Sequence, residues 1–143
     1  MTPLLKLTDF PARTYDKLRY GDTDRQGHVN NAVFTTLFET GRLTLMEANR
    51  PLLEPGFTFV VARLCADYRA EIFWPGTVEI GTGVKSVGNS SITFIQALFQ
   101  GEKCVATAES VVVQVDAKEH RPAPIGEKMR GLLEKLRLAV PEA

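Results

Sequence analysis

"VNNAVFTTLFETGRLTLMEAN" (residues 29–49) is the stretch of sequence that decides the fold. Its apolar and small residues recur at three- and four-residue steps, the pattern of one buried helical face; they are Phe34, Leu37, Phe38, Gly41, Leu45 and Ala48. Threonine and glutamate fill much of the other side. The run stops at "NRP" (49–51), because the residue before a proline avoids helical geometry. The sequence therefore predicts one long amphipathic helix, from about Val29 to Asn49.

Gly41 lies near the middle of this helical face. A glycine there costs the helix about 1 kcal/mol relative to alanine. Two interpretations remain open: close packing of this face against something flat, such as a sheet, or a glycine that the helix tolerates.

Outside this helix most of the chain reads as strands. One strand is predicted over residues 13–20, and four follow the helix in runs rich in Val, Ile, Phe and Thr; they are residues 57–70, 77–87, 91–100 and 105–116. The separators "WPG" (74–76), "GNS" (88–90) and "GEK" (101–103) are typical of turns. Such short connections imply antiparallel neighbours.

A short amphipathic helix is predicted after the last strand. Its apolar side holds Met129, Leu132, Leu133, Leu136 and Val140. The order of elements is therefore strand, long helix, four strands and short helix. It predicts a single α+β domain over residues 1–143.

The charge balance excludes one broad class of partner. Seventeen Lys and Arg against seventeen Asp and Glu give a formal net charge of zero, whereas a general nucleic-acid binder needs clustered positive charge. No stretch approaches the length of a membrane-spanning helix, and the first residues lack a secretory signal pattern. Cys65 and Cys104 lie in apolar runs and are predicted to be buried, reduced thiols rather than a disulfide or a catalytic thiol. We therefore predict a cytoplasmic protein with no nucleic-acid and no membrane partner.

"GDTDRQGHVNNAVF" (21–34) gathers polar residues at the start of the long helix. One interpretation is a helix cap, because Asp24 and Asn30 are good N-cap residues and Gly27 permits a tight turn. Another is an active site. A helix N-terminus presents unpaired N–H groups that stabilise an oxyanion, and a carboxylate just ahead of it can act as general base or nucleophile. The side-chain amides of Asn30 and Asn31 can orient a carbonyl.

No metal site is predicted in this motif. Asp22, Asp24 and Gln26 imitate the start of a calcium loop, but its twelfth position is Val33, where a bidentate Glu is needed. The chain has only two histidines, and neither has a ligand partner at a useful spacing.

"RYGDTDRQGHVNNAVFTTLFETGR" (19–42) resembles the signature of the hotdog-fold acyl-CoA thioesterases, in the 4-hydroxybenzoyl-CoA thioesterase-like group. The resemblance continues through "ADYRAEIFWPGTVEIGTGVKSVGNSSITF" (66–94) and "EKCVATAESVVVQVD" (102–116), and it covers about residues 15 to 128. It implies a hotdog fold, in which a five-stranded antiparallel sheet wraps around one long helix and a short C-terminal helix follows.

The resemblance implies hydrolysis of an acyl-CoA thioester to a free carboxylic acid and coenzyme A. Asp24 resembles the catalytic carboxylate, acting as general base or nucleophile, and the helix N-terminus after Gly27 is the implied oxyanion site. The turn "GNSS" (88–91) resembles a segment near the pantetheine arm. The implied substrate-binding residues are Gly27, His28, Val29, Asn30, Asn31, Ser90 and Ser91. No cofactor is expected, because coenzyme A is part of the substrate.

Family members pair as dimers, often as dimers of dimers, with the acyl-CoA at the subunit interface. We therefore expect a homodimer or homotetramer that builds its active site from two chains. Some relatives have histidine at the position of Asn31, with tyrosine before it, so the roles of Asn30 and Asn31 stay open. Other relatives take a carboxylate from the long helix, but Glu39 is interpreted here as an ion-pair partner of Arg42.

Two other functions remain as alternatives. One is a non-catalytic acyl-CoA-binding module on the same fold. The other is a hotdog hydratase or dehydratase, which ranks lower because those enzymes share Asp, then Asn-Pro, then His, whereas "RQG" separates Asp24 from His28. Tyr68 and Trp74 are interpreted as strand-edge and turn packing rather than as walls of an acyl pocket.

Overall fold

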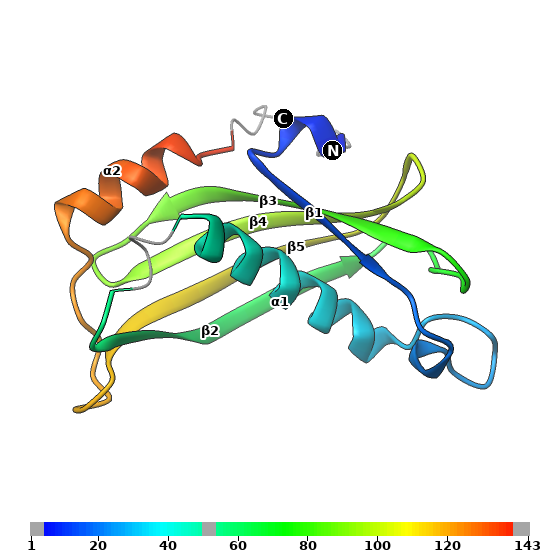
Figure 1. Ribbon diagram of the computed structural model, residues 1–143, viewed down its shortest axis with the longest axis horizontal. Coiled ribbons are helices and arrows are strands. Elements are labelled where there is room, and N and C mark those ends of the chain that lie inside the picture. Colours follow the sequence, from blue (N-terminus) through cyan, green and yellow to red (C-terminus); the bar gives the residue numbers. More distant parts are fainter. Residues whose placement is uncertain (1–4, 50–53, 139–143) are drawn as a thin grey trace.

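The computed structural model of the protein describes residues 5–49 and 54–138. Within these residues, five strands form one antiparallel sheet in the order β1-β3-β4-β5-β2; they are β1 (Ala12–Lys17), β2 (Phe57–Tyr68), β3 (Thr77–Val87), β4 (Ser91–Gln100) and β5 (Lys103–Asp116). Helix α1 (Asn31–Ala48) lies across one face of the sheet, and α2 (Glu127–Lys135) lies beside one end (Figure 1). The predicted α+β architecture, with one long helix against a five-stranded antiparallel sheet, is confirmed.

The turn residues locate the strand boundaries well, but one predicted pairing is wrong. The short connection at 74–76 does not make β2 and β3 neighbours, because β2 pairs with β5 at the far edge of the sheet and β3 lies between β1 and β4. Strands β3 and β4 have the predicted bounds, and β5 begins two residues before the predicted start at 105. Strand β2 ends at Tyr68 rather than at 70, because the N–H groups of Arg69 and Ala70 both turn to the Val105 carbonyl.

The first predicted strand is too long at its carboxyl end. Strand β1 ends at Lys17 because the Leu18 N–H leaves the ladder and donates to the Gly76 carbonyl at 2.9 Å. Tyr20–Asp22 then forms a single 3₁₀ turn. This turn redirects the chain from the sheet edge toward the start of α1.

The predicted apolar face of α1 packs on the sheet, with one exception. Phe34, Leu37, Phe38, Gly41 and Leu45 are buried. Ala48 is exposed, which corrects the prediction, and Met46 is buried instead. In α2, Met129 and Leu133 are buried as predicted, whereas Val140 lies outside the described residues.

Arg42 is buried between α1 and the sheet, with 5% of its surface exposed. It donates to the Gln96 side-chain oxygen at 3.4 Å, and the Gln96 amide in turn donates to the Phe38 carbonyl and the Thr82 hydroxyl. Burial lowers the pKa of the Arg42 guanidinium, and the negative charge of Glu39 opposes that shift. Arg42 therefore anchors the helix to the sheet, and Glu39 acts on it electrostatically from the exposed side.

Gly41 is explained by close packing, the first of the two interpretations left open above. A Cβ at this position would lie 2.6 Å from Cγ2 of Ile80 and 2.7 Å from polar side-chain atoms of Thr82 and Gln96. These distances are below van der Waals contact, and the neighbouring atoms are held in the buried hydrogen-bond network. The helix backbone can approach the sheet this closely only because residue 41 has no side chain.

Gly41→Ala is therefore expected to lower the free energy of unfolding. Overpacking costs about 1–3 kcal/mol, and alanine returns about 1 kcal/mol of helix propensity, so we expect a net loss of up to about 2 kcal/mol. Urea unfolding at equal protein concentration measures it. Gly131→Ala is the matched control, because Gly131 lies within α2 with nothing within 4 Å of its Cβ position, and this variant should be stabilised. A Gly41→Ala protein as stable as the Gly131→Ala protein would contradict the packing argument.

The two cysteines are both free thiols. Cys104 is partly buried, and burial raises the pKa of its thiol. Cys65 is exposed, so its predicted burial is wrong. It lies on β2, which is an edge strand and has no neighbouring strand within the described chain to cover its outer side. No helix in the described ranges combines the length and the apolar character needed to cross a membrane.

Candidate active site

The loop that precedes α1 (residues 23–30) is fastened by backbone pairing. Thr23 pairs with Val29, and His28 pairs with Phe73, as isolated antiparallel bridges. The loop is therefore closed on itself and also joined to the segment that follows β2. Figure 1 shows it at the end of the molecule opposite α2.

Asp24 lies in this loop with its carboxylate held in one orientation. Its Oδ1 accepts the backbone N–H of Gln26 at 2.9 Å and of His28 at 3.3 Å. Gly27, whose φ of +84° suits glycine, closes the turn by donating its N–H to the Asp24 carbonyl at 3.1 Å. Within residues 5–49 and 54–138, Oδ2 of Asp24 has no hydrogen-bond partner. One carboxylate oxygen is thus fixed, and the other is available to a ligand.

Asp22 has a structural role. It is 6% exposed, and its carboxylate accepts the backbone N–H of Arg19 at 2.9 Å and the Arg19 guanidinium at 3.0 Å. Its carbonyl accepts the Asn30 N–H at 2.8 Å. Asp22 therefore joins the 3₁₀ turn to the residue that caps α1.

Helix α1 begins at Asn31, two residues later than predicted from the apolar pattern. Val29 is apolar and buried, but it is extended, because its N–H donates to the Ile72 carbonyl at 2.9 Å. Asn30 is the N-cap, and its side-chain oxygen accepts the Ala32 N–H at 2.9 Å. The cap interpretation of the motif is thus correct for Asn30.

The start of α1 leaves one backbone N–H group available to a ligand, among the residues that the structure describes. The N–H groups of residues 27, 28, 29 and 30 are all engaged, with Asp24, Ile72 and Asp22 as acceptors. The N–H of Asn31 has no partner among the residues that the structure describes. As the first residue of an 18-residue helix, Asn31 also lies at the positive end of the helix dipole.

An open pocket of about 340 Å³ lies between the loop, the first turn of α1 and the end of β2. Its walls include four of the predicted site residues, Asp24, His28, Val29 and Asn31. Gly27 and Asn30 shape the loop without lining the pocket. The remaining lining residues are Gln26, Phe34, Tyr68, Arg69, Ala70 and Glu71.

Tyr68 packs at the end of the edge strand β2, as predicted, and it also lines this pocket, which the prediction missed. Its ring packs against Phe34 with centroids 4.9 Å apart, and its hydroxyl lies 3.5 Å from the Asn31 carbonyl oxygen. The sequence signal that could have found it is the run "DYRAE" (67–71), a polar cluster where a strand ends. Trp74 does pack in its turn, against Tyr20 at 5.2 Å.

Ser90 and Ser91 are not brought to this pocket within the chain. They lie at the β3–β4 turn, beside α2 and at the other end of the sheet (Figure 1). The Ser90 carbonyl accepts the Gln114 N–H at 2.7 Å, and Arg130 of α2 donates to the carbonyls of Gly88 and Asn89. A single chain therefore holds two of the predicted site residues far from the other six.

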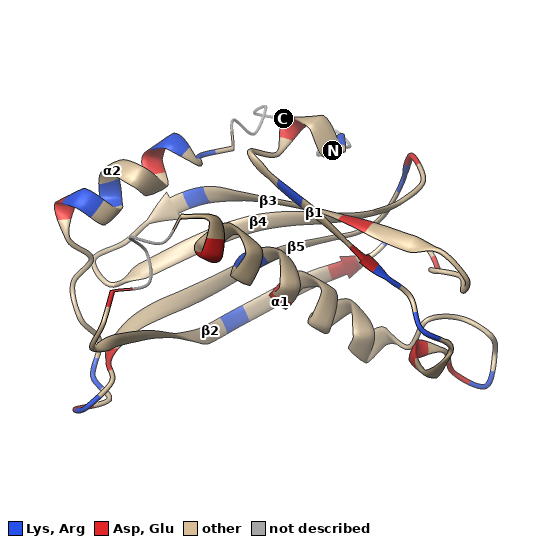
Figure 2. Ribbon diagram, viewed as in Figure 1, with Lys and Arg blue, Asp and Glu red and all other residues tan. Residues whose placement is uncertain are grey.

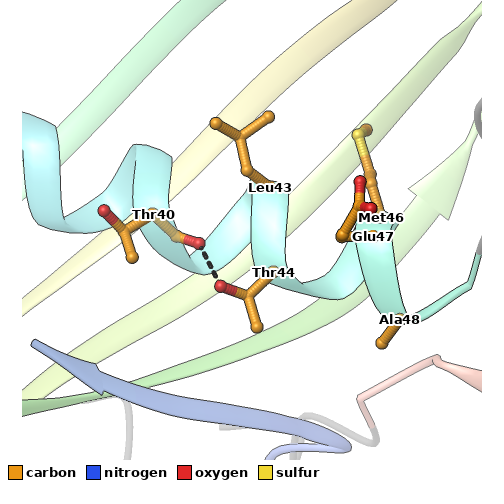
Figure 3. A pocket seen from close by; sticks show the side chains of 6 residues that line it. All are labelled: Thr40, Leu43, Thr44, Met46, Glu47 and Ala48. Atoms are coloured by element: carbon orange, nitrogen blue, oxygen red, sulfur yellow. Dashed lines mark hydrogen bonds between the residues drawn. The ribbon is translucent and has the colours of Figure 1, made fainter.

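A second hollow, of about 680 Å³, lies along the C-terminal half of α1 (Figure 3). It is lined by Thr40, Leu43, Thr44, Met46, Glu47 and Ala48. The Thr44 hydroxyl donates a hydrogen bond to the Thr40 carbonyl at 2.7 Å. No residue of the loop before α1 reaches this hollow, so it is not the candidate active site.

Known proteins resemble this chain over most of its length. It is 28% identical to the acyl-CoA thioester hydrolase YbgC of Escherichia coli O6:H1 over 118 residues, which cover 79% of this chain and 85% of YbgC. The PA5185 protein of Pseudomonas aeruginosa has 26% identity and a TM-score of 0.87, with 97% of this chain and 100% of that chain covered.

A thioesterase of Thermus thermophilus, solved in complex with coenzyme A and Zn, is 33% identical. Its TM-score is 0.80, and the match covers 90% of this chain and 95% of that one. These likenesses confirm the predicted hotdog fold. The profile of the thioesterase-like superfamily matches residues 18–133. The chain therefore belongs to the thioesterase-like superfamily.

Proposed function

We propose that the protein hydrolyses an acyl-CoA thioester to a free carboxylic acid and coenzyme A. The observation that carries this proposal is the placement of Asp24, with its unengaged Oδ2, and Asn31, with its unengaged N–H, around one pocket. Membership of the thioesterase-like superfamily and the similarity to the acyl-CoA thioester hydrolase YbgC support it.

In this mechanism Asp24 acts on the thioester through Oδ2. It either removes a proton from the attacking water or attacks the acyl carbon itself, while Oδ1 keeps the carboxylate in place. The negative charge that develops on the carbonyl oxygen is stabilised by the Asn31 N–H and the N-terminal end of α1. Collapse of this intermediate breaks the C–S bond and releases coenzyme A. Asn30 contributes as the cap that positions the helix.

Thiol release from a panel of acyl-CoAs tests the function. The panel spans short, medium and long acyl chains and an aromatic acyl group, and at least one member is expected to be hydrolysed. If acyl-CoA raises the melting temperature without thiol release, the protein is a non-catalytic binding module instead. Enoyl product from 3-hydroxyacyl-CoA would favour a hydratase or dehydratase.

We also propose a homodimer that forms through β2. This strand is at the sheet edge and exposes Phe57, Val60, Val61 and Tyr68, and an exposed apolar edge strand is prone to pair with another chain. Antiparallel pairing of two copies would set the Phe57 end of one β2 beside the Tyr68 end of the other. Ser90 and Ser91 of the second copy would then approach the pocket of the first. Sedimentation should give the mass of two chains, or of four if dimers associate further.

We further propose that hydrolysis by these residues needs no cofactor, because coenzyme A enters the site as part of the substrate. A small-molecule substrate rather than nucleic acid is supported by charges of both signs interspersed along α2 and the loops (Figure 2). We propose a single domain, because all five described strands join one sheet. The two free cysteines support a reducing compartment, which we propose is the cytoplasm. We propose no membrane partner.

A further inference from the structure

His28 and Glu71 face each other at the wall of the pocket that Asp24 lines. His28 Nε2 lies 3.4 Å from Oε2 of Glu71. Both residues line the pocket, and their side chains remain 28% and 57% exposed. An exposed pair of this kind contributes little to the free energy of unfolding. Its position beside Asp24 points instead to a role in the reaction.

The imidazole is held in a defined place. The His28 backbone bridges to Phe73, and the two rings meet edge to face with centroids 5.4 Å apart. Phe73 is itself fixed, because its N–H donates to the Gln100 side-chain oxygen at 3.1 Å and its carbonyl accepts the Gln100 amide at 2.7 Å. Glu71 then sets the rotation of the ring by facing Nε2.

The two ring nitrogens therefore have different surroundings. A carboxylate that faces Nε2 favours the tautomer that carries its proton on that nitrogen. Within residues 5–49 and 54–138, Nδ1 has no hydrogen-bond partner, so it is free to accept a proton and to pass it to a ligand. Besides Glu71, the titratable groups that line the same pocket are Asp24, Tyr68 and Arg69.

We propose that His28 is the catalytic acid that protonates the departing sulfur, and that Glu71 is its positioning residue. This inference rests on the thioester hydrolysis proposed above. As the C–S bond breaks, its electron pair goes to sulfur, which takes the Nδ1 proton. The water that supplies the new C–O bond loses a proton to Nδ1 of the imidazole, either directly or through Asp24, and this is the proton that the sulfur takes, so the ring returns to its starting state. The products are one carboxylic acid and one thiol.

Changing the leaving group tests this role. His28→Gln and Glu71→Gln are assayed on an acyl-CoA and on the nitrothiophenyl thioester of the same acid, whose acidic thiol leaves without a proton. We expect His28→Gln to lower turnover of acyl-CoA about a hundredfold but to change turnover of the nitrothiophenyl ester little. Glu71→Gln should act in the same direction with a smaller loss.

The controls separate this inference from the proposed function. Glu109→Gln breaks the Lys85–Glu109 pair, whose charged atoms lie 2.7 Å apart. Neither residue lines the pocket, so this variant should change neither rate. Melting temperatures check that each variant is folded. Equal losses on both thioesters, or no loss on acyl-CoA, would overturn the role of His28 while leaving the hydrolysis in place. A wild-type protein that releases no thiol from any acyl-CoA would overturn both.

Discussion

Replacing Asp24 with asparagine is expected to lower the rate of thiol release from acyl-CoA about 10²–10⁴-fold. The amide oxygen of asparagine can still accept the N–H groups of Gln26 and His28, so the loop should keep its shape. The change removes only the negative charge and the basic oxygen at Oδ2. The loss should therefore appear in kcat, with little change in melting temperature.

A control for Asp24→Asn is Glu102→Gln. Glu102 is an exposed carboxylate in the turn between β4 and β5, and it does not line the pocket. Its variant should retain the wild-type rate. If Asp24→Asn turned over acyl-CoA as fast as Glu102→Gln does, Asp24 would have no part in the reaction. Single-turnover hydrolysis in oxygen-18-labelled water adds a distinction, since label in the Asp24 carboxylate indicates direct attack.

Asn31→Pro is expected to lower kcat about 10²–10³-fold relative to Asn31→Ala. Proline removes the one backbone N–H that the loop leaves unengaged at the helix start. Asn31 is the first helical residue, where proline is well accepted, so no helical hydrogen bond is lost. The preceding Asn30 has φ −60° and ψ 138°, a conformation that a residue before proline adopts readily.

The comparison with Asn31→Ala isolates the backbone donor. Both variants lose the asparagine side chain, and only the proline variant loses the N–H. Thermal melting should give closely similar midpoints for the two. Equal kcat values in folded proteins would show that the oxyanion is not stabilised at this N–H. A loss already complete in Asn31→Ala would assign the role to the side-chain amide.

Much of the fold could be predicted because local signals and the final packing agree. The turns at 74–76, 88–90 and 101–103 mark strand ends through glycine, proline and asparagine, whose preferences are local. The errors occur where the tertiary arrangement overrides the pattern. Val29 looks helical by its spacing, but its bond to Ile72 keeps it extended. Cys65 looks buried because β2 is apolar, but its strand lies at the edge.

The candidate site was only partly predictable for the same reason. Asp24 and Asn30, the N-cap of α1, belong to one contiguous motif. Their side chains accept hydrogen bonds from backbone N–H groups two to four residues further along. Tyr68 and Glu71 come from a segment about forty residues later, and the register of β2 against β5 brings them to the loop. Ser90 and Ser91 lie in a turn at the other end of the sheet, and only the proposed homodimer would bring them near the pocket.

The sequence by itself determined the order of the elements, the antiparallel sheet and the carboxylate ahead of a helix. These follow from periodicity, turn chemistry and capping, which depend on neighbours along the chain. Only the tertiary structure decided which N–H of residues 27–31 stays free, why residue 41 is glycine, and which residues face Asp24 across the pocket. Those features depend on where distant segments meet. Contacts between distant segments decide which N–H and C=O groups have a partner, and no local pattern in the sequence predicts those contacts.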